Sequence, residues 1–203
     1  MGLISNGTTI FDAGAMAVGG SMVHIKTLTA SSSATLSFVN GSSGVILDAR
    51  YPEYLFLFKD IHAGTNDGDF SVLFSVNTGS SYGVAVTSTF FRVYNNEGAT
   101  DTSGPVYLAS KDQSNGTARQ PLTQGQGADN DQASVGYMHL FNPGSTTFAK
   151  NFFARTNVQE GSDYTQDEFT SGYVNTTSAI DAVRFEMHSG NIDSGTVSLY
   201  GII

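Results

Sequence analysis

Residues 180–203, with the sequence IDAVRFEMHSGNIDSGTVSLYGII, carry the pattern that decides the fold class. In the first half apolar and polar residues alternate, and the apolar set is Val183, Phe185 and Met187. A period of two is typical of a β-strand with one buried face. A second alternating stretch, with Val197 and Leu199 as apolar members, follows a polar segment that favours a turn. We therefore predict two strands joined as a hairpin within a sheet.

The same alternation recurs along the chain and predicts an all-β domain. Residues 53–61, EYLFLFKDI, are apolar on both faces, which indicates a central strand or one covered by a partner. Further strands are predicted at residues 22–29, 34–39, 70–76, 84–94, 137–141, 147–155 and 168–174, with Val76 among the inward residues. No segment keeps a helical spacing for long, and turn residues separate the strands. This pattern predicts a β-sandwich or a β-barrel, and of the two we expect an antiparallel β-sandwich.

Two segments differ from the rest and define the predicted domain organisation. Residues 1–21 are apolar but interrupted by glycines, so we expect an N-terminal extended arm, either frayed or packed on a neighbouring subunit. Residues 22–203 form the single β-sandwich domain. Within it, residues 100–133 are rich in Gln, Gly and Asn and too long for an ordinary connection. We expect a long polar excursion from one edge of the sandwich, either a floppy insertion or a loop that contacts another subunit.

The composition excludes several classes of partner. The chain of 203 residues has a net charge of −9 and only 9 Lys and Arg residues, which argues against nucleic acid and against anionic membranes as partners. It has no cysteine, so disulfides, thiolate metal sites and cysteine nucleophiles are absent. The first twenty residues lack the basic region of a signal peptide, so we expect a protein made in the cytoplasm without an export signal.

No pattern in the sequence indicates catalysis. The histidines His24, His62, His139 and His188 form no metal-binding spacing, and we expect His24, His139 and His188 to be ordinary residues of strands. No nucleophile elbow is present. We predict that the protein is not an enzyme, and we assign no catalytic, cofactor-binding or metal-binding residues.

Two acidic loops and several tyrosines are the remaining candidates for binding. Hard oxygen ligands for calcium occur near Asp67 and Asp69, together with Asp60 and Asn66, and again at residues 129–131, but the EF-hand pattern is missing, so solvated turn acids are the default. Adjacent carboxylates at 167 and 168 point to opposite faces of a strand, which argues against a glycosidase pair. Aromatic side chains that could stack on a sugar or fill a subunit interface are Tyr82, Tyr94, Tyr107 and Tyr164.

The order of segments resembles a family of small structural proteins of marine phages that end in a Gly-Thr-x-x-Leu-Tyr-Gly-Ile strand. Residues 195–202, GTVSLYGI, carry the closing motif, and the likeness extends over residues 31–38, 51–61, 139–144 and 176–180. It begins near Met22 and includes neither the N-terminal arm nor residues 100–133. The resemblance implies a jelly-roll-like β-sandwich in the virion, and it implies no catalytic residues and no cofactor.

Three functions follow as hypotheses. The first is a capsid decoration, or cement, protein that braces the shell as a homo-oligomer, possibly a trimer, in contact with the major capsid protein or other virion proteins. The alternative is a tail-fibre or receptor-binding module, lectin-like, that recognises host glycans through exposed Tyr, Asn and Asp side chains. A polysaccharide depolymerase is the least favoured, because no pair of acids stands out in the sequence.

Overall fold

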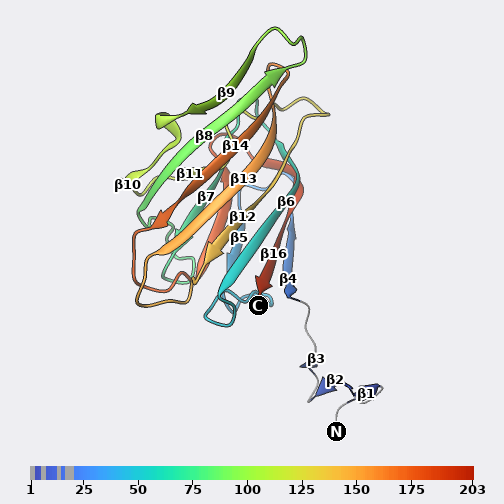
Figure 1. The fold of residues 1–203 in the computed structure, drawn as a ribbon, viewed down its shortest axis with the longest axis vertical. Helices are drawn as coiled ribbons and strands as arrows, with labels where there is room; N and C mark the ends of the chain where they lie inside the picture. Colours follow the sequence, from blue (N-terminus) through green and yellow to red (C-terminus); the bar gives the residue numbers. More distant parts are fainter. Residues whose placement is uncertain (1–2, 6–7, 13–14, 17–20) are drawn as a thin grey trace.

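Two antiparallel sheets of unequal size pack face to face in the computed structural model, which describes residues 3–5, 8–12, 15–16 and 21–203 (Figure 1). One sheet has nine strands and the other has four. The predicted all-β antiparallel sandwich is therefore confirmed, whereas the jelly-roll connectivity stays a prediction. Among the described residues, no helix is both long enough and apolar enough to cross a membrane.

The large sheet is built around a meander of long strands. Its strands, in spatial order, are β10 (Ser114–Gly116), β8 (Val86–Asn96), β14 (Tyr164–Val174), β13 (Lys150–Glu160), β12 (Ser134–Phe141), β6 (Glu53–Ala63), β16 (Ile192–Ile202) and β4 (Met22–Thr29), and β9 (Thr102–Tyr107) also pairs with β8. The predicted central position of residues 53–61 is confirmed, because β6 lies between β12 and β16.

The small sheet covers one face of the large sheet. Its spatial order is β11 (Gln120–Pro121), β7 (Phe70–Ser75), β15 (Ala182–Met187) and β5 (Leu36–Val39). Strand β7 ends at Ser75, and Val76 beyond it is exposed, so the prediction that Val76 points inward was wrong. The other three apolar residues of that strand, Phe70, Val72 and Phe74, are buried as predicted.

The predicted C-terminal hairpin is not a hairpin. Strand β15 pairs with β7 and β5 in the small sheet, whereas β16 pairs with β6 and β4 in the large sheet. The polar segment between them therefore carries the chain from one sheet to the other. The inward residues of both strands are those that the alternation indicates, because each strand turns its apolar face to the same core. The last two strands thus join the two layers, and the prediction failed only on which strands pair.

The prediction for residues 100–133 was right about their place at one edge of the sandwich and wrong about their being a loop excursion. The segment contains β9, the short 3-10 helix η1 (Ala109–Lys111), β10 and β11, and it adds strands to the same edge of both sheets. Leu122 is buried, and its backbone N–H donates to the carbonyl of Phe70 at 2.7 Å. Thr123 is buried as well and accepts a hydrogen bond from the Phe70 N–H at 2.7 Å. The segment is therefore an integral edge of the sandwich.

The first residues form short strands instead of one extended arm. Strands β1 (Leu3–Ser5), β2 (Thr8–Asp12) and β3 (Ala15–Met16) pair in an antiparallel meander, drawn at the lower right of Figure 1. Whether residues 1–21 contact a neighbouring subunit stays a prediction.

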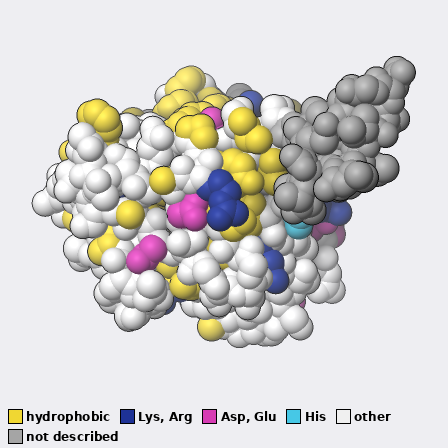
Figure 2. All heavy atoms as spheres, turned by 90° about the horizontal axis from the view of Figure 1, so that it is seen from below, with side chains coloured by type: hydrophobic (Ala, Val, Ile, Leu, Met, Phe, Trp, Pro, Cys, Tyr) yellow, Lys and Arg dark blue, Asp and Glu magenta, His cyan; other side chains and the backbone are white. Residues whose placement is uncertain are grey.

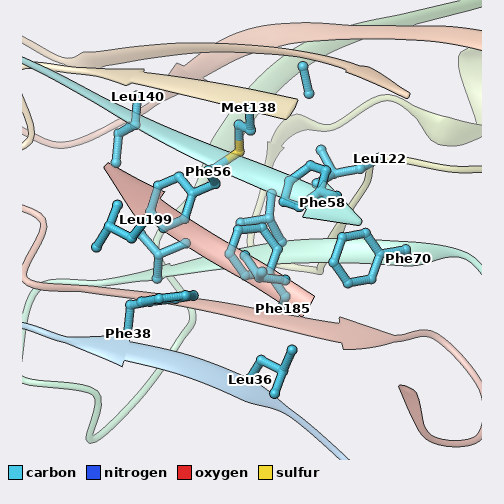
Figure 3. Packing of buried hydrophobic residues seen from close by; sticks show 14 of the residues in the cluster. Leu36, Phe38, Phe56, Phe58, Phe70, Leu122, Met138, Leu140, Phe185 and Leu199 are labelled. Atoms are coloured by element: carbon cyan, nitrogen blue, oxygen red, sulfur yellow. The ribbon is translucent and has the colours of Figure 1, made fainter. Parts of the chain in front are cut away.

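Aromatic side chains from both sheets meet in the centre of the core. The ring of Phe185 on β15 stacks on Phe70 with 5.5 Å between centroids, and it meets Phe56 and Phe58 of β6 edge-on at 5.3 Å each. Phe38 on β5 contacts Phe56 at 5.4 Å. Figure 3 shows these rings interleaved between the two layers. Edge-on and offset contacts of this kind add to the free energy gained by burial, so this cluster fastens the small sheet to the large one.

Both glycines of the closing motif have a structural reason. Gly195 has φ of +110°, which favours glycine, and a Cβ there would lie 2.4 Å from the carbonyl oxygen of Asp60. It sits where the pairing of β16 with β6 shifts register. Gly201 leaves room for the ring of Tyr51, whose nearest carbon would be 2.3 Å from a Cβ. The motif therefore encodes a β-bulge and an aromatic packing site.

Candidate functional site: the aromatic face of the large sheet

The face of the large sheet that points away from the core carries a row of aromatic side chains on neighbouring strands. Phe91 on β8 lies opposite Phe169 on β14, and their rings stack with 4.8 Å between centroids. Arg155 on β13 is the next residue of the row, and its guanidinium carbon lies 5.1 Å from the centre of the Phe169 ring. Tyr137 on β12 and Leu57 on β6 continue it. Cross-strand neighbours of this kind stabilise a sheet by contact between their side chains.

A second row runs beside the first. Phe153 on β13 lies opposite His139 on β12, and the two rings stack with 4.7 Å between centroids. Phe141 contacts Phe153 at 5.6 Å and completes a three-ring cluster. Leu55 on β6 and Tyr200 on β16 extend the row toward β4. We call the two rows together the aromatic face, defined by Phe91, Phe169, Arg155, Tyr137, Phe153, His139 and Phe141.

Water reaches the aromatic face, because no layer formed by the described residues packs over it. Phe91 keeps 38% and Phe153 keeps 41% of its surface exposed, and the other rings are half-buried by their neighbours. Monomeric proteins rarely leave contiguous aromatic surface in water without a use for it, and such patches mark sites of association. The composition, aromatic rings with one arginine, is that of the centre of a protein interface.

Charges on the aromatic face are paired. Arg155 donates two hydrogen bonds to the carboxylate of Asp167, at 2.9 and 2.7 Å, and this partner raises the pKa of the guanidinium further. His139 contacts the carboxylate of Glu53. Figure 2 shows a different surface, the lower end of the molecule, where charged side chains are likewise few and uncharged side chains and backbone cover most of the view. Covering the ion pairs of the aromatic face still costs desolvation free energy, but the pairing avoids the larger cost of burying a charge without its partner.

The histidines lie in strands of the large sheet or next to a strand of the small sheet, and two of them bond to backbone groups. His24 and His139 lie within β4 and β12, as predicted, whereas His188 lies just beyond the end of β15. The Nδ1 atom of His188 accepts a hydrogen bond from the backbone N–H of Asp69 at 3.0 Å, and Nδ1 of His62 lies 2.7 Å from the carbonyl of Gln132. Across the part of the chain that the structure describes, no three His, Asp or Glu side chains come together as a metal site would require.

The acidic residues of the two predicted loops differ in burial and in their partners. Asp69 is buried, forms an ion pair with Lys111, and accepts the N–H of Gly125 at 3.0 Å. This carboxylate therefore ties the edge segment to the start of β7, because each of its oxygens bonds to a residue of that segment. Asp67 and residues 129–131 are exposed on loops.

The adjacent acids at positions 167 and 168 point to opposite faces, as predicted. Asp167 pairs with Arg155 on the outer face, whereas Glu168 is buried between the sheets. Both carboxylate oxygens of Glu168 accept the N–H of Gln124, at 3.0 and 3.1 Å. Burial nevertheless raises the pKa of Glu168 well above its usual value, because removal from water disfavours the charged form more than the bond to Gln124 and the charge of Arg92 favour it.

The four tyrosines selected from the sequence lie apart from one another except for one pair. Tyr94 and Tyr164 meet edge-on with 5.7 Å between ring centroids. Tyr107, opposite Phe91 on β9, is 62% exposed and extends the aromatic face to the edge strand. Tyr82 lies in a loop under the guanidinium of Arg184, whose carbon is 4.3 Å from the ring centre.

Sequence reasoning missed the aromatic face. The signal was present, because Phe91, Phe153 and Phe169 occupy positions at which their strands turn outward and where polar residues are expected. Reading it required the register of four strands, which the alternation within one strand does not supply.

Comparison with known proteins leaves the site to be interpreted from its geometry. No protein-family model, no curated protein and no solved structure matches this chain.

Proposed function

We propose that this protein is a structural protein of a phage virion and decorates the capsid, where it braces the shell through contacts with copies of itself and with the major capsid protein. The observation that carries the proposal is the aromatic face, a large outward-facing apolar surface on a rigid sheet. The resemblance of the closing motif to phage structural proteins supports the choice of a virion.

The aromatic face fits a second copy of the same chain. The chain carries a net charge of −9, so two copies repel one another over most of their surfaces. On the aromatic face the charges of Arg155 and Asp167 cancel at hydrogen-bonding distance. Two copies that meet through this face bury rings against rings and bring no unpaired charge together. Sheets pack face to face at about 10 Å, a spacing that rings of this size fill.

Bracing a shell requires only binding free energy. Burial of apolar surface contributes about 25 cal/mol per Å², and a stable interface of standard size buries about 1,200–2,000 Å² in total. A partner that binds the assembled shell and not its dissociated parts stabilises the shell by mass action. A β-sandwich with an apolar outer face is suited to this role. The predicted trimer is one of the closed arrangements that symmetry allows.

The copy number in purified virions tests the proposal. Quantitative mass spectrometry against the major capsid protein should find hundreds of copies per particle if the protein covers the shell. A few copies, or labelling by antibodies at the tail tip alone, would contradict a decoration role.

A pair of variants connects the virion role to the aromatic face. Phe153→Asp places a carboxylate in the centre of the face, whereas Phe148→Asp adds the same charge at a loop residue that is 70% exposed. We expect virions grown with the first variant to lose the protein and virions grown with the second to keep it. Equal incorporation of both would refute the involvement of this face.

A further inference from the structure

One end of the sandwich contains a polar hollow of about 430 Å³ that is separate from the aromatic face. Three segments that are distant in sequence form its walls: the turn after β8 (residues 95–99), the loop before β12 (residues 129–132) and the turn between β13 and β14 (residues 159–165). The volume is within the range of about 300–1,000 Å³ that is usual for small-molecule sites.

The aromatic wall of the hollow is held in place before any ligand binds. Tyr164 lines the hollow, and its hydroxyl donates to the carboxylate of Asp101 at 2.9 Å. Its ring meets the ring of Tyr94 edge to face, with 5.7 Å between centroids. The side-chain oxygen of Asn96 accepts the backbone N–H groups of Thr100 and Asp101, at 2.9 and 3.1 Å, and so fixes the turn that carries Asp101. A wall fixed in this way loses little conformational entropy on binding.

The opposite wall is fixed as well. Gln132 is buried, and its side-chain oxygen accepts the N–H of Asp129 at 3.1 Å, which closes the loop before β12. Asn95 and Asp131 line the hollow from the two sides with exposed side chains. Amide groups both donate and accept hydrogen bonds, and carboxylates accept them. These side chains therefore match a ligand that has many hydroxyl groups.

We propose that the hollow binds a neutral saccharide, with the ring of Tyr164 as the surface on which a sugar ring stacks. The wall residues Glu97, Asp129, Asp131 and Asp163 carry carboxyl groups, so the hollow repels anionic sugars and accepts the hydroxyls of neutral ones. This inference goes beyond the decoration role and does not depend on it. A copy held on a shell through its aromatic face keeps this end of the sandwich available to glycans of the host surface.

Titration with defined oligosaccharides, followed by NMR of the side-chain amide groups, tests the proposal on the whole chain. Chitotriose, maltotriose and cellotriose are the neutral probes, 3′-sialyllactose is the anionic comparison, and calcium chloride is added separately. We expect at least one neutral probe to shift the amide signals of Asn95, Asn96, Gln132 or Gln159 in a saturable manner, whereas sialyllactose causes no shift. The absence of saturable shifts with every neutral probe up to about 10 mM, where even weak complexes form, would overturn the proposal. Stronger binding of sialyllactose, or a response to calcium alone, would overturn it as well.

A matched pair of tyrosine variants assigns the binding to the hollow. Tyr164→Leu removes the proposed stacking ring, whereas Tyr82→Leu removes a tyrosine in a loop against Arg184, outside both the hollow and the aromatic face. We expect the first to weaken binding of the neutral probe about two- to tenfold, because aromatic contacts of this type contribute about 0.5–1.5 kcal/mol beyond burial. The second should leave it unchanged. If both bind as the wild type does, the hollow is not the site.

An additional variant keeps the test informative if Tyr164→Leu fails to fold. Asn95→Ala shortens an exposed side chain that forms no side-chain hydrogen bond with the described residues, so its fold should persist. Weaker binding by Asn95→Ala would support the proposal, and unchanged affinity in this folded variant would overturn it. Because these readouts measure sugar binding alone, their failure leaves the copy number in virions unaffected, and the two proposals are tested separately.

Discussion

Replacement of Phe185 by alanine is expected to be among the most destabilising single changes in this protein. The side chain is fully buried, and it lies on β15, one of the two inner strands of the small sheet, where it faces β6 of the large sheet. Its ring contacts those of Phe38, Phe56, Phe58 and Phe70, with centroid distances between 5.3 and 6.3 Å. The variant therefore removes the one ring that is common to these contacts and leaves a cavity between the layers.

The expected loss follows from this geometry. Truncation of a buried phenylalanine to alanine costs about 3–5 kcal/mol, and the cost is largest where rigid neighbours cannot fill the cavity. Here the neighbours are rings held on strands of two sheets, so we expect a value at the upper end, about 4–5 kcal/mol. Native domains are stable by only about 5–15 kcal/mol. The variant should therefore lose about a quarter or more of the free energy of unfolding.

Urea unfolding of the purified protein measures this loss. The chain has no tryptophan, so circular dichroism in the far ultraviolet is the suitable signal. Phe148→Ala is the matched control, because Phe148 is 70% exposed and its truncation should change stability by less than about 0.5 kcal/mol. A loss below about 2 kcal/mol for Phe185→Ala, or equal losses for the two variants, would refute the argument that this ring joins the layers.

Other predictions concern buried charge and backbone strain. Burial raises the pKa of Glu168 above 4.5, so the contribution of its protonated form to stability is full below pH 4.5 and is lost as the pH rises through the folded-state pKa. The free energy of unfolding of Glu168→Gln, measured relative to that of the wild type, should therefore rise with pH. Urea titrations from pH 4.5 to 8 that show the opposite slope would contradict this prediction. Burial lowers the pKa of Lys150, whose ammonium donates to the carbonyls of residues 176 and 178, so the wild type should become more stable as the pH approaches 10.5. Lys150→Met should lack this gain in the free energy of unfolding. Identical pH profiles for the two proteins would contradict this prediction. Gly195→Ala should lower the free energy of unfolding by about 1–3 kcal/mol, because residue 195 has a positive φ and a Cβ there would meet the carbonyl of Asp60. Gly83→Ala, which has open space around it, should lower the melting temperature much less than Gly195→Ala does. Similar melting temperatures for the two variants would argue against strain at the bulge.

The sequence predicts strands better than it predicts which strands are partners. Alternation along residues 182–187 and 192–202 identifies two strands and their buried faces, because side chains point to opposite sides of a strand in turn. The alternation is the same whether the strands pair with one another or belong to opposite layers of a sandwich. A polar turn suits both arrangements, so the hairpin was wrong although the faces were right.

Residues 100–133 illustrate a second limit. Low hydrophobicity predicts a loop, yet Gln120 and Gln126 in this segment are fully buried. Gln120 accepts a hydrogen bond from the hydroxyl of Ser88, and Gln126 accepts one from Ser134. Buried polar groups are tolerated when such partners satisfy them. Composition alone does not indicate these partners, because the fold brings Ser88 of β8 and Ser134 of β12 against the segment.

The candidate sites depend on the same long-range information. The apolar character of residues 53–61 on both faces indicated covered surface, and Leu55 and Leu57 of that strand do flank the aromatic face. The row that joins Phe91 to Phe169, however, requires the register of strands more than seventy residues apart. The polar hollow likewise combines three turns that only the fold brings together.

Sedimentation equilibrium is the most direct test of the claim that the aromatic face joins copies of this protein. We predict that the wild type is an oligomer, that Phe153→Asp is a folded monomer, and that Phe148→Asp, which adds the same charge elsewhere, keeps the oligomer. A monomeric wild type, or an oligomer that Phe153→Asp leaves intact, would contradict the account.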